Sequence, residues 1–190
     1  MKTYLKSSIL LTLVLVIITA VIYPLAVRGI AYLSPGQGRG VTIEKDGKVV
    51  GYANIGQKFT DDKYFWGRPS AVDYNAAGSA GSNKGPSNPD YLKTVQERID
   101  TFLAHNPGIS KSQIPAEMVT ASGSGLDPNI SLQSALIQVP RVAKVRGIAA
   151  EQLTQLVQKQ KEGALLGFLG PDDKINVLQL NIELDKLTSK

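Results

Sequence analysis

The sequence predicts a single N-terminal transmembrane helix plus one mixed α/β (α+β) domain. Residues 7–27, SSILLTLVLVIITAVIYPLAV, contain no charged side chain. A helix of this length reaches about 31 Å, close to the thickness of the bilayer hydrocarbon. No second run of this kind follows, and the rest of the chain mixes strand-like and helix-like patterns. We therefore expect a cytoplasmic tail over residues 1–6, an anchor over 7–31, a linker over 32–40 and a soluble extracytoplasmic domain over 41–190.

The apolar run is interpreted as an anchor that stays in place. The alternative is a cleaved signal peptide, which has an apolar core of about 7–15 residues and a small-x-small cleavage site. We expect the membrane span to begin at Ile9 and to end at Ala31. Two lysines precede the run, whereas Arg28 and Arg39 follow it, and this small bias favours a cytoplasmic N-terminus. The chain is thus expected to cross the inner or plasma membrane once, with its domain outside the cytoplasm.

Composition narrows the class of protein. The chain has no cysteine, so an exported domain must be stable through its core alone. The net charge is +5, but the first 31 positions hold three of the 21 basic residues and none of the 16 acidic ones. The balance of basic and acidic residues in the rest of the chain is ordinary, and no basic stripe interleaved with aromatic residues occurs. A nucleic-acid partner is therefore not expected.

Turn signals outline the first half of the domain. Asp46-Gly47 stands between VTIEK and KVVGYAN, which predicts a β-hairpin over residues 41–54. Residues 67–90 are rich in Gly, Ser, Asn and Pro and lack an apolar period. A loop of that length inside a compact domain is typically functional or mobile.

Apolar periodicity outlines the second half. Helical spacing predicts helices over residues 89–105, 131–146 and 150–162, and Pro140 predicts a kink or break in the second of these. Leucine and isoleucine alternate with polar residues over 178–184, which predicts a half-buried strand.

Few residues offer catalytic chemistry. The only histidine, His105, ends a predicted helix and is interpreted as a surface or C-cap residue. No cysteine is available to bind zinc, and no P-loop occurs. Two Gly/Ser stretches, GSAGSN at 78–83 and SGSG at 122–125, could cradle an anion with backbone N–H groups, although most such loops are purely structural. The residues favour a membrane-tethered interaction module over an enzyme, with no catalytic residue and no metal ligand expected.

An aromatic cluster begins the long loop. Tyr64, Phe65 and Trp66 are consecutive and precede Gly-Arg-Pro. Trp, Tyr and Arg are enriched where proteins bind each other most tightly. Phe65 is expected at the edge of the core, whereas Trp66 and Arg68 fit a core position and a partner contact equally well.

Five segments carry a family resemblance: YFWGRPSAVDYN (64–75), GSAGSNKGPSNP (78–89), VTASGSGLDPNIS (119–131), QVPRVAKVRG (138–147) and VLQLNIELD (177–185). Together with the N-terminal anchor they resemble the C subunit of the Kdp-type potassium-transporting ATPase, the KdpC family. The resemblance spans nearly the whole chain and keeps the order of the motifs.

The resemblance implies an accessory, non-catalytic subunit of a high-affinity, ATP-driven potassium import complex. The implied partners are a channel-like potassium-binding A subunit, a P-type ATPase B subunit, a very small F subunit and membrane lipid. The C subunit is required for assembly and is described as a catalytic chaperone that raises the affinity of the B subunit for ATP. No tightly bound cofactor is implied, and ATP would be met through the complex. An anchored extracytoplasmic enzyme or binding module unrelated to transport is the alternative.

The resemblance also implies candidate nucleotide-binding residues. In the chaperone account, Ser122, Gly123, Ser124 and Gly125 resemble an ABC-type signature, and Gln138 matches a glutamine that is also invoked. A cytoplasmic N-terminus, however, places this loop outside, whereas ATP is cytoplasmic. The two implications conflict, and we follow the topology.

We therefore expect the domain to lie over the potassium entrance of the A subunit. There the SGSG loop and the aromatic-Arg loop would contact partners. The candidate interface residues are Tyr64, Trp66, Arg68, Asn75 and Asn83.

Overall fold

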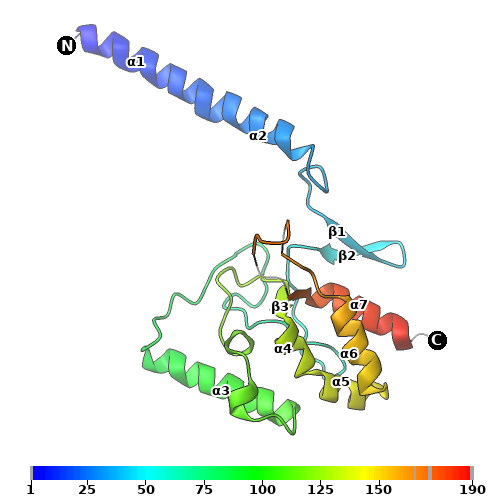
Figure 1. Ribbon diagram of the computed structural model, residues 1–190. Coiled ribbons are helices and arrows are strands. Elements are labelled where there is room, and N and C mark those ends of the chain that lie inside the picture. Colours follow the sequence, from blue (N-terminus) through cyan, green and yellow to red (C-terminus); the bar gives the residue numbers. More distant parts are fainter. Residues whose placement is uncertain (1, 165, 171–172, 189–190) are drawn as a thin grey trace. The chain divides into compact units, whose positions relative to one another are not determined.

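The computed structural model describes residues 2–164, 166–170 and 173–188. The chain divides into two compact units, Met1–Thr42 and Ile43–Lys190. The N-terminal helix belongs to the first unit, and the helices from α3 onward, together with nearly all of the strand residues, belong to the second (Figure 1).

The helix of the first unit is continuous. It consists of α1 (Lys2–Val16), a π-helical stretch (Ile17–Ile22) and α2 (Tyr23–Ala31). Pro24 accounts for the π-helical stretch, because its ring crowds the carbonyl four residues earlier and the wider turn relieves that crowding. Among the described residues, Tyr4–Ala31 is the one helix long and apolar enough to cross a membrane, as the sequence predicts.

A series of turns follows α2. The backbone N–H groups of Ser34, Gln37 and Arg39 donate to carbonyls three residues earlier, at 3.1, 3.0 and 2.9 Å. Gly36 has a φ of +77°, and a Cβ there would lie 2.5 Å from the carbonyl oxygen of Gly40, so only glycine fits. The predicted linker is thus folded rather than extended.

The β-hairpin forms as predicted. Strands β1 (Thr42–Lys45) and β2 (Lys48–Tyr52) pair into a two-stranded sheet. Asp46 and Gly47 both have positive φ, +53° and +73°, which is the requirement of a type I′ turn.

A second small sheet is not foreseen by the sequence pattern. Strand β3 (Asn129–Ser131) pairs antiparallel with β4 (Lys174–Asn176), and Ile130 faces Ile175 in the register. Three-residue strands are too short to show a period, so no alternation announces them.

Most helices begin and end where the sequence signals place them. Helix α3 (Pro89–His105) is capped by Asn88, whose side chain accepts a hydrogen bond from the N–H of Tyr91. The long helix predicted around Pro140 is broken into α4 (Leu132–Leu136) and α5 (Val139–Arg146). Helix α6 (Ala150–Lys159) follows.

The strand predicted over residues 178–184 is wrong, since the segment is helix α7 (Val177–Thr188). Alternation indicates a strand only when the intervening polar residues face water. Here Asn181 is 2% exposed, so the helix is buried on more than one face. Asn176 starts it, because its side-chain oxygen accepts a hydrogen bond from the N–H of Gln179 at 3.1 Å.

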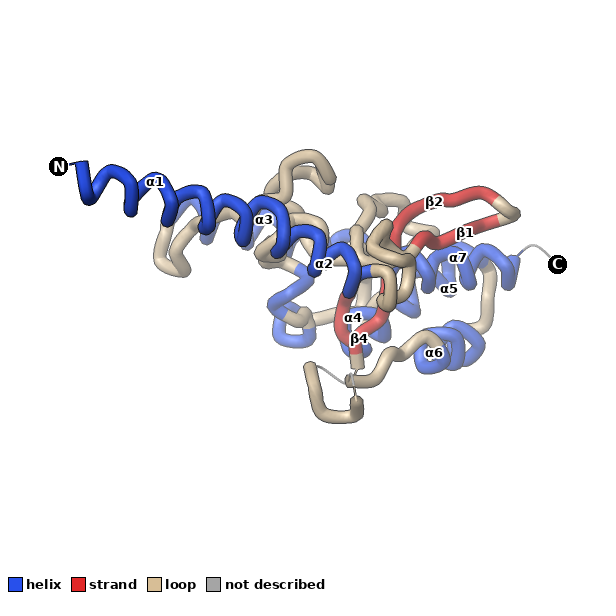
Figure 2. The backbone as a smooth tube through the Cα atoms, turned by 90° about the horizontal axis from the view of Figure 1, so that it is seen from above, coloured by secondary structure: helices blue, strands red, loops and turns tan. Residues whose placement is uncertain are grey.

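The core of the second unit lies mainly among α4–α7 and the β3–β4 sheet, and α3 lies to one side of them (Figures 1 and 2). Asn106, at the C-terminal end of α3, is hydrogen-bonded to Arg141 of α5. The segment around Phe65 bridges the two parts. The buried apolar cluster comprises Phe65, Phe102, Met118, Ile130, Ala135, Val139, Val142, Ala143, Leu153, Val157, Ile175, Val177, Leu180 and Leu184.

Candidate interaction site

Two side-chain amides hold the aromatic segment in place. The N–H of Phe65 donates to Asn181 Oδ1, and Asn181 Nδ2 donates back to the Phe65 carbonyl, both at 2.9 Å. Gln138 pairs with Trp66 in the same way. The N–H of Trp66 donates to Gln138 Oε1 at 2.8 Å, and Gln138 Nε2 donates to the Trp66 carbonyl at 3.2 Å. The two carboxamides thus take the place of a neighbouring β-strand. Phe65 is fully buried, as predicted.

A buried arginine holds the same segment from another side. Arg141 is 5% exposed and donates to the carbonyls of Asp62 and Tyr64, at 2.6 and 3.0 Å. It also donates to the side chains of Asn106 and Gln138. Burial lowers the pKa of Arg141 to about 10, so the guanidinium keeps its charge at neutral pH.

An aromatic ring covers this arginine. The Arg141 guanidinium carbon lies 4.4 Å from the centre of the Trp66 ring, and the His105 ring packs on the same indole at 5.0 Å. His105 ends α3, as predicted, and its Nδ1 lies 2.8 Å from a carboxylate oxygen of Asp62. Trp66 therefore joins α3 to α5, which fixes its indole in one place.

A second ionic cluster anchors Tyr64. Its hydroxyl donates to Asp185 at 3.3 Å, and this carboxylate also accepts from Lys45 and Arg146 at 2.7 Å each. Partial burial raises the pKa of Asp185, but the hydrogen bonds from Lys45 and Arg146 outweigh burial and set the pKa below its ordinary value. Tyr64 is thereby tied to α5, α7 and β1.

The loop after the aromatic segment is folded on itself. Ser70 Oγ accepts from the N–H groups of Val72 and Tyr74, at 3.2 and 2.9 Å, and donates to the carbonyl of Gly125 at 2.7 Å. The Tyr74 hydroxyl donates to the Arg68 carbonyl at 2.5 Å. Burial raises the pKa of Tyr74 to about 12, so this donor keeps its proton.

The two Gly/Ser stretches interlock with that loop. The N–H of Ser122 donates to the carbonyl of Pro69 at 3.1 Å, and Ser79 Oγ donates to the carbonyl of Ser124 at 2.9 Å. A Cβ at Gly81 would lie 2.9 Å from the carbonyl oxygen of Gly123. Three segments that carry the family resemblance therefore meet in one structure.

The predicted nucleotide-binding residues are placed in two groups. Ser122, Gly123, Ser124 and Gly125 lie in the interlocked loops, where Ser122 is 3% exposed. Gln138 is fully buried, and its side-chain amide is hydrogen-bonded to Trp66, Ser134 and Arg141. Within the described part of the chain, no hydrogen bond joins Gln138 to the SGSG loop.

The predicted interface residues divide by exposure. Tyr64, Trp66 and Arg68 are half-buried, whereas Asn75 and Asn83 are exposed. Arg68 donates to Asp127 at 3.0 Å. The half-buried three lie in the segment held by the carboxamides and the arginine, and the exposed two lie farther along the loop.

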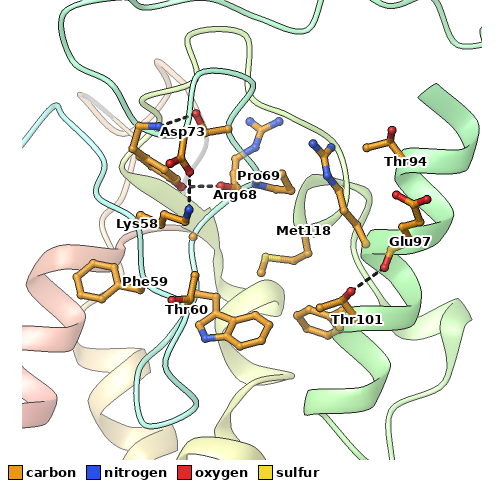
Figure 3. Close-up of a pocket in the computed structure, with 16 residues that line it drawn as sticks. Lys58, Phe59, Thr60, Arg68, Pro69, Asp73, Thr94, Glu97, Thr101 and Met118 are labelled. Carbon is orange, nitrogen blue, oxygen red and sulfur yellow. Dashed lines mark hydrogen bonds and ion pairs between the residues drawn. The ribbon is translucent and has the colours of Figure 1, made fainter. Parts of the chain in front are cut away.

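A cleft of about 480 Å³ lies between α3 and the loop (Figure 3). Thr94, Glu97 and Thr101 of α3 form one wall, and Arg68 and Pro69 belong to the other. Met118 lies between them in Figure 3, and the Trp66 and Phe102 rings, which meet edge to face at 6.5 Å, contribute apolar surface. The volume and the apolar lining suit a buried side chain or a short segment of another molecule.

Sequence reasoning missed three of the residues that build this site. Asn181, Arg141 and Asn106 are polar, and each is at most 5% exposed. Arg141 lies among the apolar residues of α5, which was the available signal, since a buried cation requires partners. Nothing in the pattern around Asn106 pointed to its contact with Arg141.

A candidate membrane span followed by a separate folded unit is the organisation of a membrane-anchored protein. The chain belongs to the KdpC family, because residues 5–186 match the family described as "KdpC: K+-transporting ATPase, c chain". The expected function as an accessory subunit of a potassium-transporting ATPase is thereby confirmed, and the alternative unrelated to transport is not favoured.

Curated relatives agree over full length. The chain is 60% identical to the potassium-transporting ATPase KdpC subunit of Flavobacterium johnsoniae, over 95% of this chain and 97% of the relative. It is 51% identical to the subunit of the same name from Bacteroides fragilis, with complete coverage of both chains. A third such subunit, from Caldanaerobacter subterraneus, is 49% identical over 94% of this chain and 93% of the relative.

Proposed function

We propose that this chain is a non-catalytic subunit whose folded unit lies outside the cytoplasm and stabilises the potassium-transporting complex by protein contact. The partners in this proposal are the channel-like potassium-binding subunit, the P-type ATPase subunit and the small F subunit. The cleft beside Trp66 and Arg68 is the proposed contact surface. The observation that carries the proposal is the rigid mounting of Trp66 on one side of that cleft.

The mounting argues for recognition because it fixes a surface before any partner arrives. Gln138 holds the Trp66 backbone, and Arg141 and His105 hold its ring. A preformed surface loses less conformational entropy on binding than a mobile one. Trp and Arg at such a surface are the residue types that contribute most to protein–protein affinity.

The proposed side of the membrane rests on the flanking charges of the span. Lysines at positions 2 and 6 precede the apolar run, and this pattern favours a cytoplasmic N-terminus. The native chain has no cysteine, so a single introduced cysteine reports its own position. Ser112→Cys in the exposed turn after α3 should react with a membrane-impermeant thiol reagent in intact cells, whereas Tyr4→Cys should react only after lysis. The reverse pattern contradicts the proposal.

The nucleotide contact implied by the resemblance stays a prediction. The residues implied in that contact make structural hydrogen bonds in the folded unit. The Gln138 side-chain amide accepts the Trp66 N–H, and the Ser122 N–H donates to the Pro69 carbonyl. The proposed orientation also separates the SGSG loop from cytoplasmic ATP. Both features favour contact between subunits as the mode of action.

The contact surface is tested by filling the cleft. Thr101→Trp places a large ring in the cleft from an exposed position of α3, and Gln96→Trp places the same ring at an exposed position of α3 outside the cleft. We expect Thr101→Trp to reduce co-purification with a tagged ATPase subunit and potassium-stimulated ATP hydrolysis by tenfold or more. Gln96→Trp should leave both unchanged. Wild-type behaviour of Thr101→Trp, with an unchanged melting temperature, contradicts the cleft as the interface.

A further inference from the structure

An apolar loop of the second unit has no role in the subunit contacts proposed above. Leu166 and Phe168 are each 75% exposed, and Leu169 is 49% exposed. The segment over residues 163–170, GALLGFLG, carries no charged side chain. Its base is closed by Glu162 and Lys174, which pair as a β-bridge and as an ion pair at 3.2 Å.

The backbone of this apolar loop turns through unusual conformations. Leu166 has a φ of +56°, and Gly167 and Gly170 have φ values of +80° and +93°. Glycine adopts this region freely, but a leucine does so at a cost. The loop thus exposes large apolar side chains and holds one of them in a strained conformation. Strain and apolar exposure together point to a contact made outside the folded unit.

The place of the apolar loop in the second unit indicates which contact this is. In Figure 1 the loop (orange) rises from the same edge of the unit as the start of β1. The chain enters the unit at β1, after the membrane span has ended at Ala31. The ten residues between Ala31 and Thr42 reach at most about 36 Å even when fully extended, and their turns shorten that distance. The loop therefore lies on the edge of the unit through which the chain connects to the span.

We propose that residues 166–169 rest in the interfacial layer of the membrane in which the chain is anchored. Leu166, Phe168 and Leu169 lie there among the lipid headgroups and the upper acyl chains. The loop has no charge and no side-chain hydrogen-bond donor with which to select a protein partner, whereas apolar side chains suit this layer irrespective of the lipid headgroup. The proposal rests on the membrane anchor and is independent of the cleft beside Trp66.

The test uses the full-length chain in vesicles, with one introduced cysteine carrying an environment-sensitive fluorophore. Phe168→Cys reports on the apolar loop, and Ser112→Cys, in the exposed turn after α3, is the matched control. Vesicles contain phosphatidylcholine, with or without phosphatidylglycerol and with or without brominated acyl chains. We expect brominated lipid to quench the probe at position 168 at least threefold more than the probe at 112, equally with and without the anionic lipid.

Three results overturn the proposal. The first is equal access of an aqueous quencher to both probes in the chain alone, because the loop is then in water. The second is protection of position 168 that appears only when the other subunits are added, which assigns the apolar loop to a protein partner. The third is quenching that requires phosphatidylglycerol, which contradicts insertion by apolar contact. Co-purification of the complex is measured in parallel, and normal assembly with an unquenched probe separates failure of this inference from failure of the subunit contact.

Discussion

Asn181 and Phe65 lie 116 positions apart and exchange two hydrogen bonds of 2.9 Å. The side chain of one residue thereby satisfies the whole backbone of the other. Truncation of Asn181 to alanine leaves a buried N–H and a buried carbonyl without partners, each at a cost of about 1–3 kcal/mol.

We therefore predict that Asn181→Ala lowers the free energy of unfolding by about 2–5 kcal/mol. Urea unfolding of the full-length chain in detergent, followed by the fluorescence of its only tryptophan, measures the change. Asn54→Ala, at an exposed position, should change stability by less than about 0.5 kcal/mol. Similar stability of both variants contradicts the assigned role of Asn181.

We predict that Arg141 is as important as Asn181 for the stability of the folded unit and that its substitution is poorly tolerated. Arg141→Met removes the donor of four hydrogen bonds, and the expected loss is about 3–5 kcal/mol. Lys144→Met on the same helix removes an exposed cation and should have little effect. Circular dichroism is the suitable measurement, since loss of the guanidinium over Trp66 alters fluorescence by itself.

The lowered pKa of Asp185 predicts that the stability of the protein falls at acidic pH. Its pKa in the folded state is lowered from the ordinary 3.8, so the unfolded chain binds its proton more readily. The stabilisation by Asp185 is fully present above pH 3.8 and is lost as the pH falls through the lower pKa of the folded state. Unfolding free energies measured from pH 7 down to pH 2 should show this loss in the wild type.

Two variants test that assignment. Asp185→Asn removes the titrating group, so the slope of stability against pH should flatten in this window. Lys45→Met removes one of the hydrogen bonds that lower the pKa, so the loss should be smaller and should be complete nearer to the ordinary value. An unchanged profile in both variants excludes Asp185 as the source.

The SGSG loop offers a matched pair of glycines. Gly125 has a φ of +68°, and a Cβ there would lie 2.6 Å from Val72 Cγ2 and 2.8 Å from the carbonyl oxygen of Ala80. Gly123 has open space around it. We predict that Gly125→Ala lowers stability by at least about 1 kcal/mol, whereas Gly123→Ala does not.

The same pair tests the nucleotide hypothesis. If the SGSG loop has a structural role, Gly123→Ala should leave the apparent affinity of the assembled complex for ATP unchanged. A rise of several-fold in the ATP concentration needed for half-maximal hydrolysis, with assembly intact, would revive a nucleotide contact at this loop.

The elements that could be predicted carry strong local signals. Asp46-Gly47 fixes a turn by its own backbone preferences, and Asn88 with Pro89 starts α3 without help from distant residues. Pro140 breaks its helix because it lacks a backbone N–H. In each case the physical cause lies within a few residues of the signal.

The features that could not be predicted depend on distant partners. The sequence pattern places Asn181 on the exposed side of a strand, whereas in the structure its side-chain amide hydrogen-bonds to the Phe65 backbone. Arg141 and Gln138 acquire their roles from the segment around Trp66, more than 70 positions earlier. Local sequence patterns do not indicate such long-range pairings. Both the helical state of α7 and the construction of the site therefore had to come from the three-dimensional structure.

The separation of 116 residues between Phe65 and Asn181 also bears on the time course of folding. The aromatic segment is made early in synthesis, but its backbone partner arrives only with the last helix of the chain. Contacts so distant in sequence form slowly, because a long loop must close before they repay its entropy. The segment that lines the cleft is therefore completed only after α7 has been synthesised.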